Sequence, residues 1–318
     1  MYFKQFSAFI LLTVLLSSCE KEVEIAKKNS NKCIVANALI TENQPIEVMI
    51  FRGVDYVGRR GSMPMNNANL FVYHSDTLLE EINGTDDNGF YYTSVVPKTG
   101  EDYSIKIDCQ HYPTATAIAT IPTPVQIEVL QADSVHVYLD DYYSDYESYS
   151  NVVVSITDTT CDLRYYLITA TGYYRPSNNP DTIKTHSLTL ICNNATAKTT
   201  SMTDILNHMF ESSDVEHVQT KEYILLSNKD WHGSSATISF EVHHSSAIPP
   251  DINVMSFTED YYKYFVAKEY LKNSDDEDFM FSEPVNVYSN VHNGLGLFAG
   301  YNMATTKLYS ICDTVYNE

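Results

Sequence analysis

The segment from Asp140 to Tyr149 is the part of the chain whose residue types most strongly suggest chemistry. It holds four acidic side chains and, as its four tyrosines, Tyr142, Tyr143, Tyr146 and Tyr149. Carboxylates at this density could bind Ca²⁺ through hard oxygen ligands, but the EF-hand spacing is absent. Exposed tyrosines bury much area at low entropic cost, so they suit contact with a ligand or partner. A solvated acidic loop is the alternative that requires no function.

A run of glycines at positions 294, 296 and 300 is the second unusual feature. The spacing only superficially resembles a dinucleotide-binding fingerprint, because the third glycine is one position late and no βαβ unit surrounds it. A tight turn before the final strand explains the run better, since glycine adopts positive φ and lets backbones approach closely. Asn293, Gly294 and Gly296 remain candidates for ligand or partner contact.

Known catalytic motifs are missing: the sequence has no nucleophile elbow, HExxH motif, P-loop or SxxK-led penicillin-binding set. His243 and His244 are adjacent in a predicted strand, so their rings should point to opposite faces and cannot chelate one ion together. The run Asp275–Asp278 is interpreted as solvated charge. We therefore expect no catalytic residues, no metal and no cofactor. A hydrolase site assembled from distant residues stays open, because sequence cannot show convergence in space.

The N-terminus has the features of a lipoprotein leader. Lys4 supplies a positive charge, and Phe6–Leu16 is an apolar run too short to span a bilayer core. The following Leu16-Ser17-Ser18-Cys19 resembles a bacterial lipobox. On that resemblance, residues 1–18 are a signal peptide and residues 19–31 a tether lipidated at Cys19. Two or more acyl chains would anchor the protein stably.

The acidic residues that follow Cys19 resemble the surface-export signals of Bacteroidetes lipoproteins. The expected location is therefore the outer membrane, lipid-anchored and exposed at the cell surface. Beyond Cys19 the chain has five cysteines, Cys33, Cys109, Cys161, Cys192 and Cys312, without metal-binding spacing. Cys33–Cys109 and Cys161–Cys192 are possible disulfides in an oxidising compartment, and buried free thiols are the alternative.

Charge excludes one class of partner. The 318 residues carry 41 acidic and 20 basic side chains, for a net charge of −21, which argues against binding nucleic acid. The length suggests about two domains. The fold class is predicted to be mainly β: an immunoglobulin-like or prealbumin-like sandwich over residues 32–122, then a larger β-rich domain over residues 125–318. Pro122-Thr123-Pro124 is a stiff linker between them.

The two domains are predicted from short apolar runs. In the first they lie at residues 33–40, 47–51, 69–74, 77–83, 90–96, 102–109 and 114–121, with a hairpin turn at residues 84–89. In the second, strands are expected at residues 126–130, 152–156, 165–173, 185–192, 221–226, 236–243 and 285–288. Helices are expected near 202–211, from its apolar periodicity, and near 258–273, after a capping-box-like Ser256–Glu259.

A family resemblance covers nearly the whole mature chain. Residues 284–301, PVNVYSNVHNGLGLFAGY, resemble the C-terminal signature of a Bacteroidetes lipoprotein family known only as a domain of unknown function. The first strand ANALIT, the hairpin NGFYY and the helix start EDYY also match in order. Such proteins are typically encoded beside TonB-dependent receptors. The resemblance implies a non-catalytic accessory subunit of such a transporter, with an unknown small-molecule, peptide or glycan ligand. A free-standing surface adhesin or glycan-binding lipoprotein is the alternative.

Overall fold

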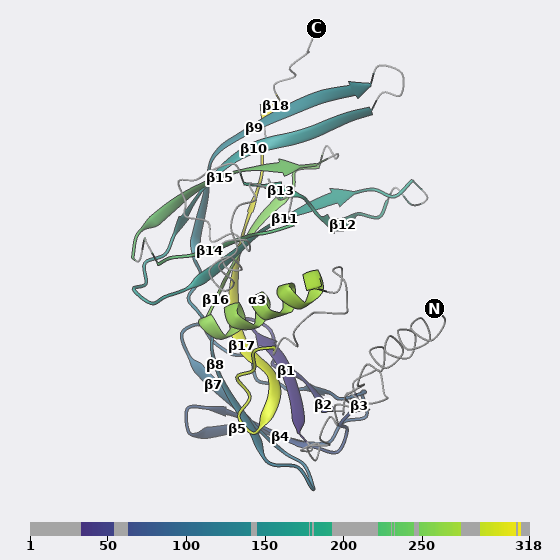
Figure 1. Ribbon diagram of the computed structural model, residues 1–318, viewed down its shortest axis with the longest axis vertical. Coiled ribbons are helices and arrows are strands. Elements are labelled where there is room, and N and C mark those ends of the chain that lie inside the picture. Colours follow the sequence, from purple (N-terminus) through teal and green to yellow (C-terminus); the bar gives the residue numbers. More distant parts are fainter. Residues whose placement is uncertain are drawn as a thin grey trace, which may run out of the picture. The chain divides into compact units, whose positions relative to one another are not determined.

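The computed structural model describes residues 33–53, 63–140, 145–177, 179, 181–192, 222–229, 231, 233–244, 248–274, 287–309 and 311–312. The described chain is mostly β-strand, which confirms the predicted fold class (Figure 1). Lys32–Glu318 form one compact unit. Among the described residues, no helix is both long and apolar enough to cross a membrane. The expected helix near 202–211, the Asp275–Asp278 run and Cys19 lie outside the described residues.

The N-terminal strands form a two-layer sandwich. They are β1 (Ile34–Ile40), β2 (Glu47–Arg52), β3 (Met63–Pro64), β4 (Asn69–His74), β5 (Thr77–Asn83), β6 (Phe90–Tyr92), β7 (Asp102–Asp108) and β8 (Ala115–Thr120). One layer contains β1, β2, β3 and β6, and the other has the order β5-β4-β7-β8. Alternate residues of both layers meet in one core, among them Ile34, Val48, Tyr91 and Ile105. The seven strands predicted here are present, although the fifth ends at Tyr92 rather than residue 96.

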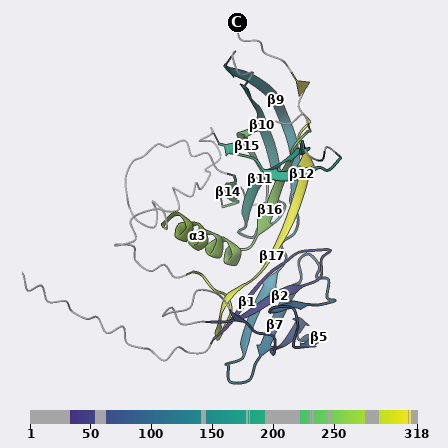
Figure 2. The same ribbon diagram turned by 90° about the vertical axis from the view of Figure 1, so that its right-hand side faces the viewer.

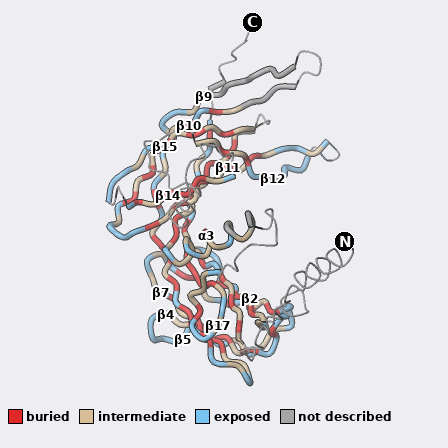
Figure 3. Tube along the Cα trace, viewed as in Figure 1, coloured by how far each residue is buried: buried red, intermediate tan, exposed pale blue. Residues whose placement is uncertain are grey.

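The C-terminal half builds a second core. Its strands are β9 (Gln126–Asp140), β10 (Asp145–Thr157), β11 (Tyr165–Tyr174), β12 (Lys184–Ser187), β13 (Leu190–Ile191), β14 (Ile224–Ser227), β15 (Ser235–His243), β16 (Asp251–Phe257), β17 (Gly294–Lys307) and β18 (Ile311–Cys312). A five-stranded sheet, β13-β15-β10-β9-β18, shares this core with β11, β14 and β16. Figure 3 shows the buried residues along these strands, and in β11 and β16 they alternate with half-buried ones.

Strand β17 joins the two halves. Its first residues, Gly294–Gly300, pair in parallel with β1, and Tyr301–Lys307 pair antiparallel with β16. One nine-stranded sheet therefore contains strands from both sides of the linker at residues 122–124 (Figure 2). Its main path is β12-β11-β16-β17-β1-β2-β3. The domain boundary placed there stays a prediction, but the C-terminal strand contributes Phe298 to the N-terminal core.

Several predicted elements are corrected. Val287 and Tyr288 are described but not in a strand, so the strand expected at 285–288 does not extend over them. The stretch at 185–192 forms two short strands, β12 and β13, rather than one. Strand β16 was not predicted. Its residue Ser256 is buried and donates to the carbonyl of Asn302 at 3.4 Å, so it is not the helix cap.

The one helix of the described part, α3 (Glu259–Ser274), lies within one residue of the predicted 258–273. Glu259 and Asp260 stand in its first turn, as the helix dipole favours. Its aromatic side chains close a third core with β11 and β16: Tyr262 stacks on Tyr165 with centroids 3.9 Å apart, and Tyr261 meets Phe257 edge-on.

A buried polar network holds the linker. Arg164 donates to the carbonyl of Thr123 at 3.1 Å and to its hydroxyl at 2.6 Å. The buried carboxylate of Asp158 accepts from Tyr166 and from both the amide and hydroxyl of Thr160. Because each buried oxygen of Asp158 has a partner, the network carries no unpaired charge.

Candidate functional site

The outer surface of β1, β2 and β6 carries a continuous set of side chains that the core does not use. In the strand register Asn37 lies opposite Met49, and Met49 opposite Phe90. One row further, Glu47 lies opposite Tyr92. Paired residues share one face of a sheet, so these side chains are neighbours. We call this surface the β1–β2–β6 face and define it by Val35, Asn37, Leu39, Glu47, Met49, Phe51, Phe90 and Tyr92.

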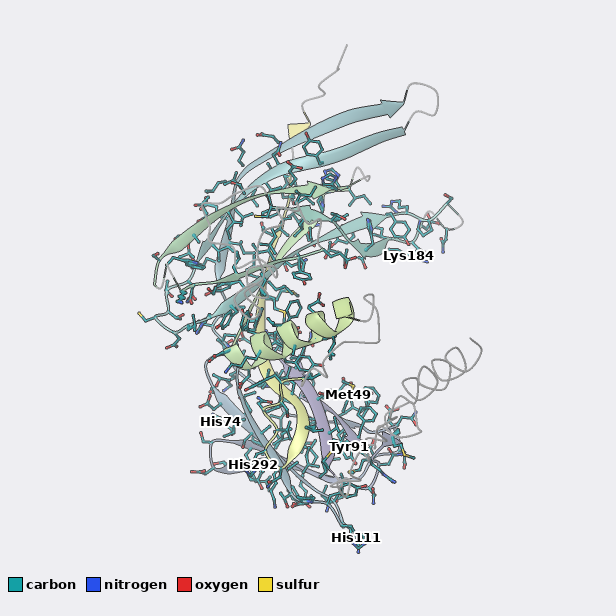
Figure 4. All side chains as sticks on the ribbon, in the orientation of Figure 1. Met49, His74, Tyr91, His111, Lys184 and His292 are labelled. Carbon is teal, nitrogen blue, oxygen red and sulfur yellow. The ribbon has the colours of Figure 1, made fainter. Side chains whose placement is uncertain are left out.

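A pocket opens on this face where β1 turns into β2. Its volume is about 190 Å³, and it is lined by Asn37, Ala38, Leu39, Thr41, Gln44, Pro45, Glu47 and Met49. Figure 4 labels Met49, one of the lining residues, and Tyr91 on the neighbouring strand β6. The side chains that alternate with the lining residues, such as Val48 and Ile50, are fully buried in the core. The pocket, which we call the β1–β2 pocket, therefore has a rigid floor.

Two aromatic rings of β6 lie beside the pocket on the same face of the sheet, although neither lines it. Phe90 and Tyr92 are nearly parallel, at 13°, with centroids 6.3 Å apart. Tyr92 is 56% exposed, and Phe90 is half-buried. A hydrogen bond with Asp87 raises the pKa of Tyr92 above its ordinary value, and burial and the negative charges of Asp87 and Glu47 add to the effect. Tyr92 is therefore neutral at physiological pH, and it presents a partly solvent-exposed aromatic ring.

The electrostatics of the pocket favour neutral or cationic ligands. Among its lining residues Glu47 is charged, and none is lysine, arginine, histidine or cysteine. Nearby, Glu42 accepts a hydrogen bond from Thr99 at 2.6 Å. The lining offers the amides of Asn37 and Gln44, the hydroxyl of Thr41 and the carboxylate of Glu47. These groups can bind a polar ligand, but they include no nucleophile activated by a base.

The predicted tyrosine site is only partly described. Tyr142 and Tyr143 lie outside the described residues, and the side chain of Tyr146 is likewise not described. Tyr149 lies in β10, half-buried, with its ring stacked on His243 of β15 at 5.6 Å. It belongs to the five-stranded sheet and shares no sheet with Asn293, Gly294 or Gly296.

The candidate residues near the C-terminus have structural roles. Asn293 adopts a φ of 56° in the turn before β17, and Gly294 and Gly296 are strand residues rather than the tight turn itself. A Cβ on Gly296 would lie 2.0 Å from the carbonyl oxygen of Ala36, and its φ is +112°. A Cβ on Gly300 would lie 2.1 Å from the carbonyl oxygen of Thr120. The glycines let β17 approach two neighbouring strands closely, as expected from the sequence.

The histidine and cysteine candidates can also be placed. His243 ends β15, and His244 follows it with its Nε2 2.9 Å from the hydroxyl of Ser150. In the described part of the chain, no group of three metal-ligating side chains comes together. Four cysteines, Cys33, Cys109, Cys161 and Cys192, are free thiols, so neither possible disulfide forms in this structure.

The β1–β2–β6 face is not among the candidate sites predicted from the sequence. A signal was present: Asn37 is a polar residue inside an apolar strand, and Phe90 and Tyr92 fall in the NGFYY hairpin. The strand alternation places Glu47 and Met49 on one face, but only the pairing of β6 with β2 brings the rings beside them. That pairing joins residues more than 40 positions apart.

The comparisons with known proteins give a family and no activity. No curated protein matches the chain. The family model described as "Domain of unknown function (DUF4249)" matches residues 20–307, which is nearly the whole of the chain beyond its first residues. The chain therefore belongs to the DUF4249 family.

Proposed function

We propose that this protein is a non-catalytic, lipid-anchored subunit of the outer membrane that captures a ligand for a TonB-dependent transporter. The observation that carries the proposal is the β1–β2–β6 face, which combines a polar pocket with the half-buried ring of Phe90 and the exposed ring of Tyr92. A polar pocket that has no base-activated nucleophile in its lining suits binding of a ligand rather than reaction with it.

The anchor is supported by the leader. The lipobox-like residues before Cys19 and the acidic residues after it resemble those of surface lipoproteins of Bacteroidetes. The binding face begins soon after that cysteine, because Val35 lies only 16 residues further along the chain. A lipid anchor at Cys19 would thus hold the face close to an integral partner in the same membrane.

The non-catalytic, accessory role is supported by the residue types that line the pocket. The lining of the pocket contains no nucleophile with an adjacent base. Residues 284–301 resemble lipoproteins that are encoded beside TonB-dependent receptors, and this resemblance suggests such a receptor as the partner. A free-standing surface adhesin is the second candidate, and the exposed ring of Tyr92 beside the half-buried ring of Phe90 favours it, because aromatic side chains are enriched in protein interfaces.

The test is affinity purification of the full chain, tagged on the chromosome, from native membranes in a gentle detergent. We expect a TonB-dependent receptor to be recovered at about equal stoichiometry. The Cys19→Ala variant is the matched control, because it removes the lipid site and should recover far less receptor. Recovery of the lipidated protein without any receptor would contradict the accessory role and favour the adhesin.

A further inference from the structure

We infer that the β1–β2 pocket, with the adjoining rings of Phe90 and Tyr92, binds a neutral saccharide chain. The inference deepens the proposed function, since it rests on the protein being a binding subunit and names its ligand class.

The hydrogen-bonding groups of the pocket require a ligand that both donates and accepts. The Oδ1 of Asn37 already accepts from the backbone N–H of Leu297 at 3.2 Å, which leaves its amide hydrogens as donors. Gln44 offers a donor and an acceptor, Thr41 offers both, and Glu47 only accepts. An ammonium group only donates, so it would satisfy Glu47 and leave the amide donors without partners. Hydroxyl groups both donate and accept, so a ligand that carries several of them can form hydrogen bonds with all four side chains.

The aromatic rings of Phe90 and Tyr92 favour a ligand that has an apolar face beside its hydroxyl groups. Glu47 lines the pocket and lies directly opposite Tyr92 on the neighbouring strand, while Met49 lies opposite Phe90. Side chains opposite each other across a ladder are about 4.5–5.5 Å apart at Cβ. A ligand that extends from the pocket across Glu47 and Met49 would therefore reach the rings, although neither ring lines the pocket itself. Sugar rings fit this demand, because they carry C–H groups on one face and hydroxyls around the edge.

The volume of the pocket and the charge of the protein restrict the class of ligand further. The volume of 190 Å³ is below the roughly 300–1,000 Å³ of pockets that enclose drug-sized molecules. One sugar ring would occupy the pocket and the next would lie across Phe90 and Tyr92. The net charge of −21 and the carboxylate of Glu47 disfavour acidic glycans and phosphorylated ligands.

The test is binding of the full-length lipidated chain, in mild detergent, to neutral hexasaccharides of glucose, mannose, xylose and N-acetylglucosamine. Saturation-transfer NMR and calorimetry measure the binding. We expect at least one to bind with an affinity that is nearly unchanged between about 0.05 and about 0.5 M NaCl, because no ion pair is involved. Putrescine is the cationic probe, and its binding in place of all the hexasaccharides, lost in Glu47→Gln, would overturn the inference.

Variants distinguish saccharide binding at the β1–β2–β6 face from binding elsewhere on the protein. Tyr92→Ala should weaken saccharide binding about 5- to 10-fold, the change expected for one aromatic contact. Gln44→Ala, on an exposed turn, should weaken it several-fold without touching the core. Tyr174→Ala is the matched control, since Tyr174 is also exposed on a strand but lies on β11. Binding of none of the four hexasaccharides, or equal binding by Tyr92→Ala, Gln44→Ala and the wild type, would overturn the inference.

The result is independent of the transporter test. Failure of saccharide binding would leave a co-purified receptor standing and remove only the ligand class. Saccharide binding without a receptor would remove the accessory role and keep the site.

Discussion

The side chain of Asn290 pairs with the backbone of Phe298 as a neighbouring strand would. Its Nδ2 donates to the carbonyl of Phe298 at 2.8 Å, and its Oδ1 accepts from the N–H of Phe298 at 2.9 Å. Phe298 lies in the part of β17 that pairs with β1 on one side and precedes the residues paired with β16. The amide therefore satisfies the backbone groups on that edge of β17. Asp260 of α3 fixes the same amide and the hydroxyl of Tyr288.

The first prediction concerns this amide. Asn290→Ala should lower the free energy of unfolding by about 2–4 kcal/mol, because it leaves two backbone groups of Phe298 without partners. Urea denaturation followed by circular dichroism measures the change. Asn83→Ala, on the exposed face of β5, is the control and should change stability by less than about 0.5 kcal/mol. Equal stability of the two variants would contradict the role of Asn290.

The second prediction separates steric contact from backbone conformation. Gly296→Ala should destabilise the protein by more than about 3 kcal/mol or prevent folding, because its Cβ would collide with the carbonyl of Ala36. Gly100 also has a positive φ, but a Cβ there would meet nothing within 4 Å. Gly100→Ala should therefore cost only about 1–2 kcal/mol. Thermal unfolding of both variants provides the comparison, and equal losses would show that contact with β1 is unimportant.

The third prediction concerns acid. Burial opposes ionisation of Asp158, but hydrogen bonds from Tyr166 and Thr160 and the charge of Arg164 lower its pKa overall. Because the folded pKa lies below the unfolded one, this carboxylate stabilises the fold above about pH 4 and stops doing so as the pH falls through the folded pKa. Asp158→Asn should be about 3 kcal/mol less stable at neutral pH. The difference from the wild type should shrink below about pH 4.

Urea titrations across pH measure that difference, with Asp162→Asn as the control, since the exposed Asp162 contributes only its backbone carbonyl to the network. A difference between Asp158→Asn and the wild type that stays constant with pH would refute the assignment.

The fourth prediction concerns alkali. Burial raises the pKa of Tyr262 to about 12, and neighbouring Tyr165 adds to the effect. A tyrosine with a raised folded pKa stabilises the fold below the unfolded value of about 10, and this contribution is lost as the pH rises toward the folded value. Between these two values Tyr262→Phe should lose less stability with rising pH than the wild type does. Denaturant melts with tyrosinate absorbance measure this, and Tyr174→Phe should follow the wild type.

The sequence by itself determined the local structure. Alternation of apolar and polar residues located most of the strands, and the Asn88-Gly89 turn has the positive φ values that its residue types favour. The helix at Glu259–Ser274 followed from its charge pattern, with Glu259 and Asp260 in the first turn, whereas the predicted cap Ser256 lies in β16. These features depend on residues within a few positions of one another, which is why they could be predicted.

Only the tertiary structure decided how the strands combine. The parallel pairing of β17 with β1 joins residues about 260 positions apart, and no local pattern encodes it. The same pairing gave Gly296 its close contact with Ala36, and gave Asn37 its hydrogen bond to Leu297. The candidate site arose in the same way, because Glu47 and Tyr92 become neighbours only when β6 pairs with β2. Long-range pairing depends on which hydrophobic faces can be buried together, and that is settled by the whole chain.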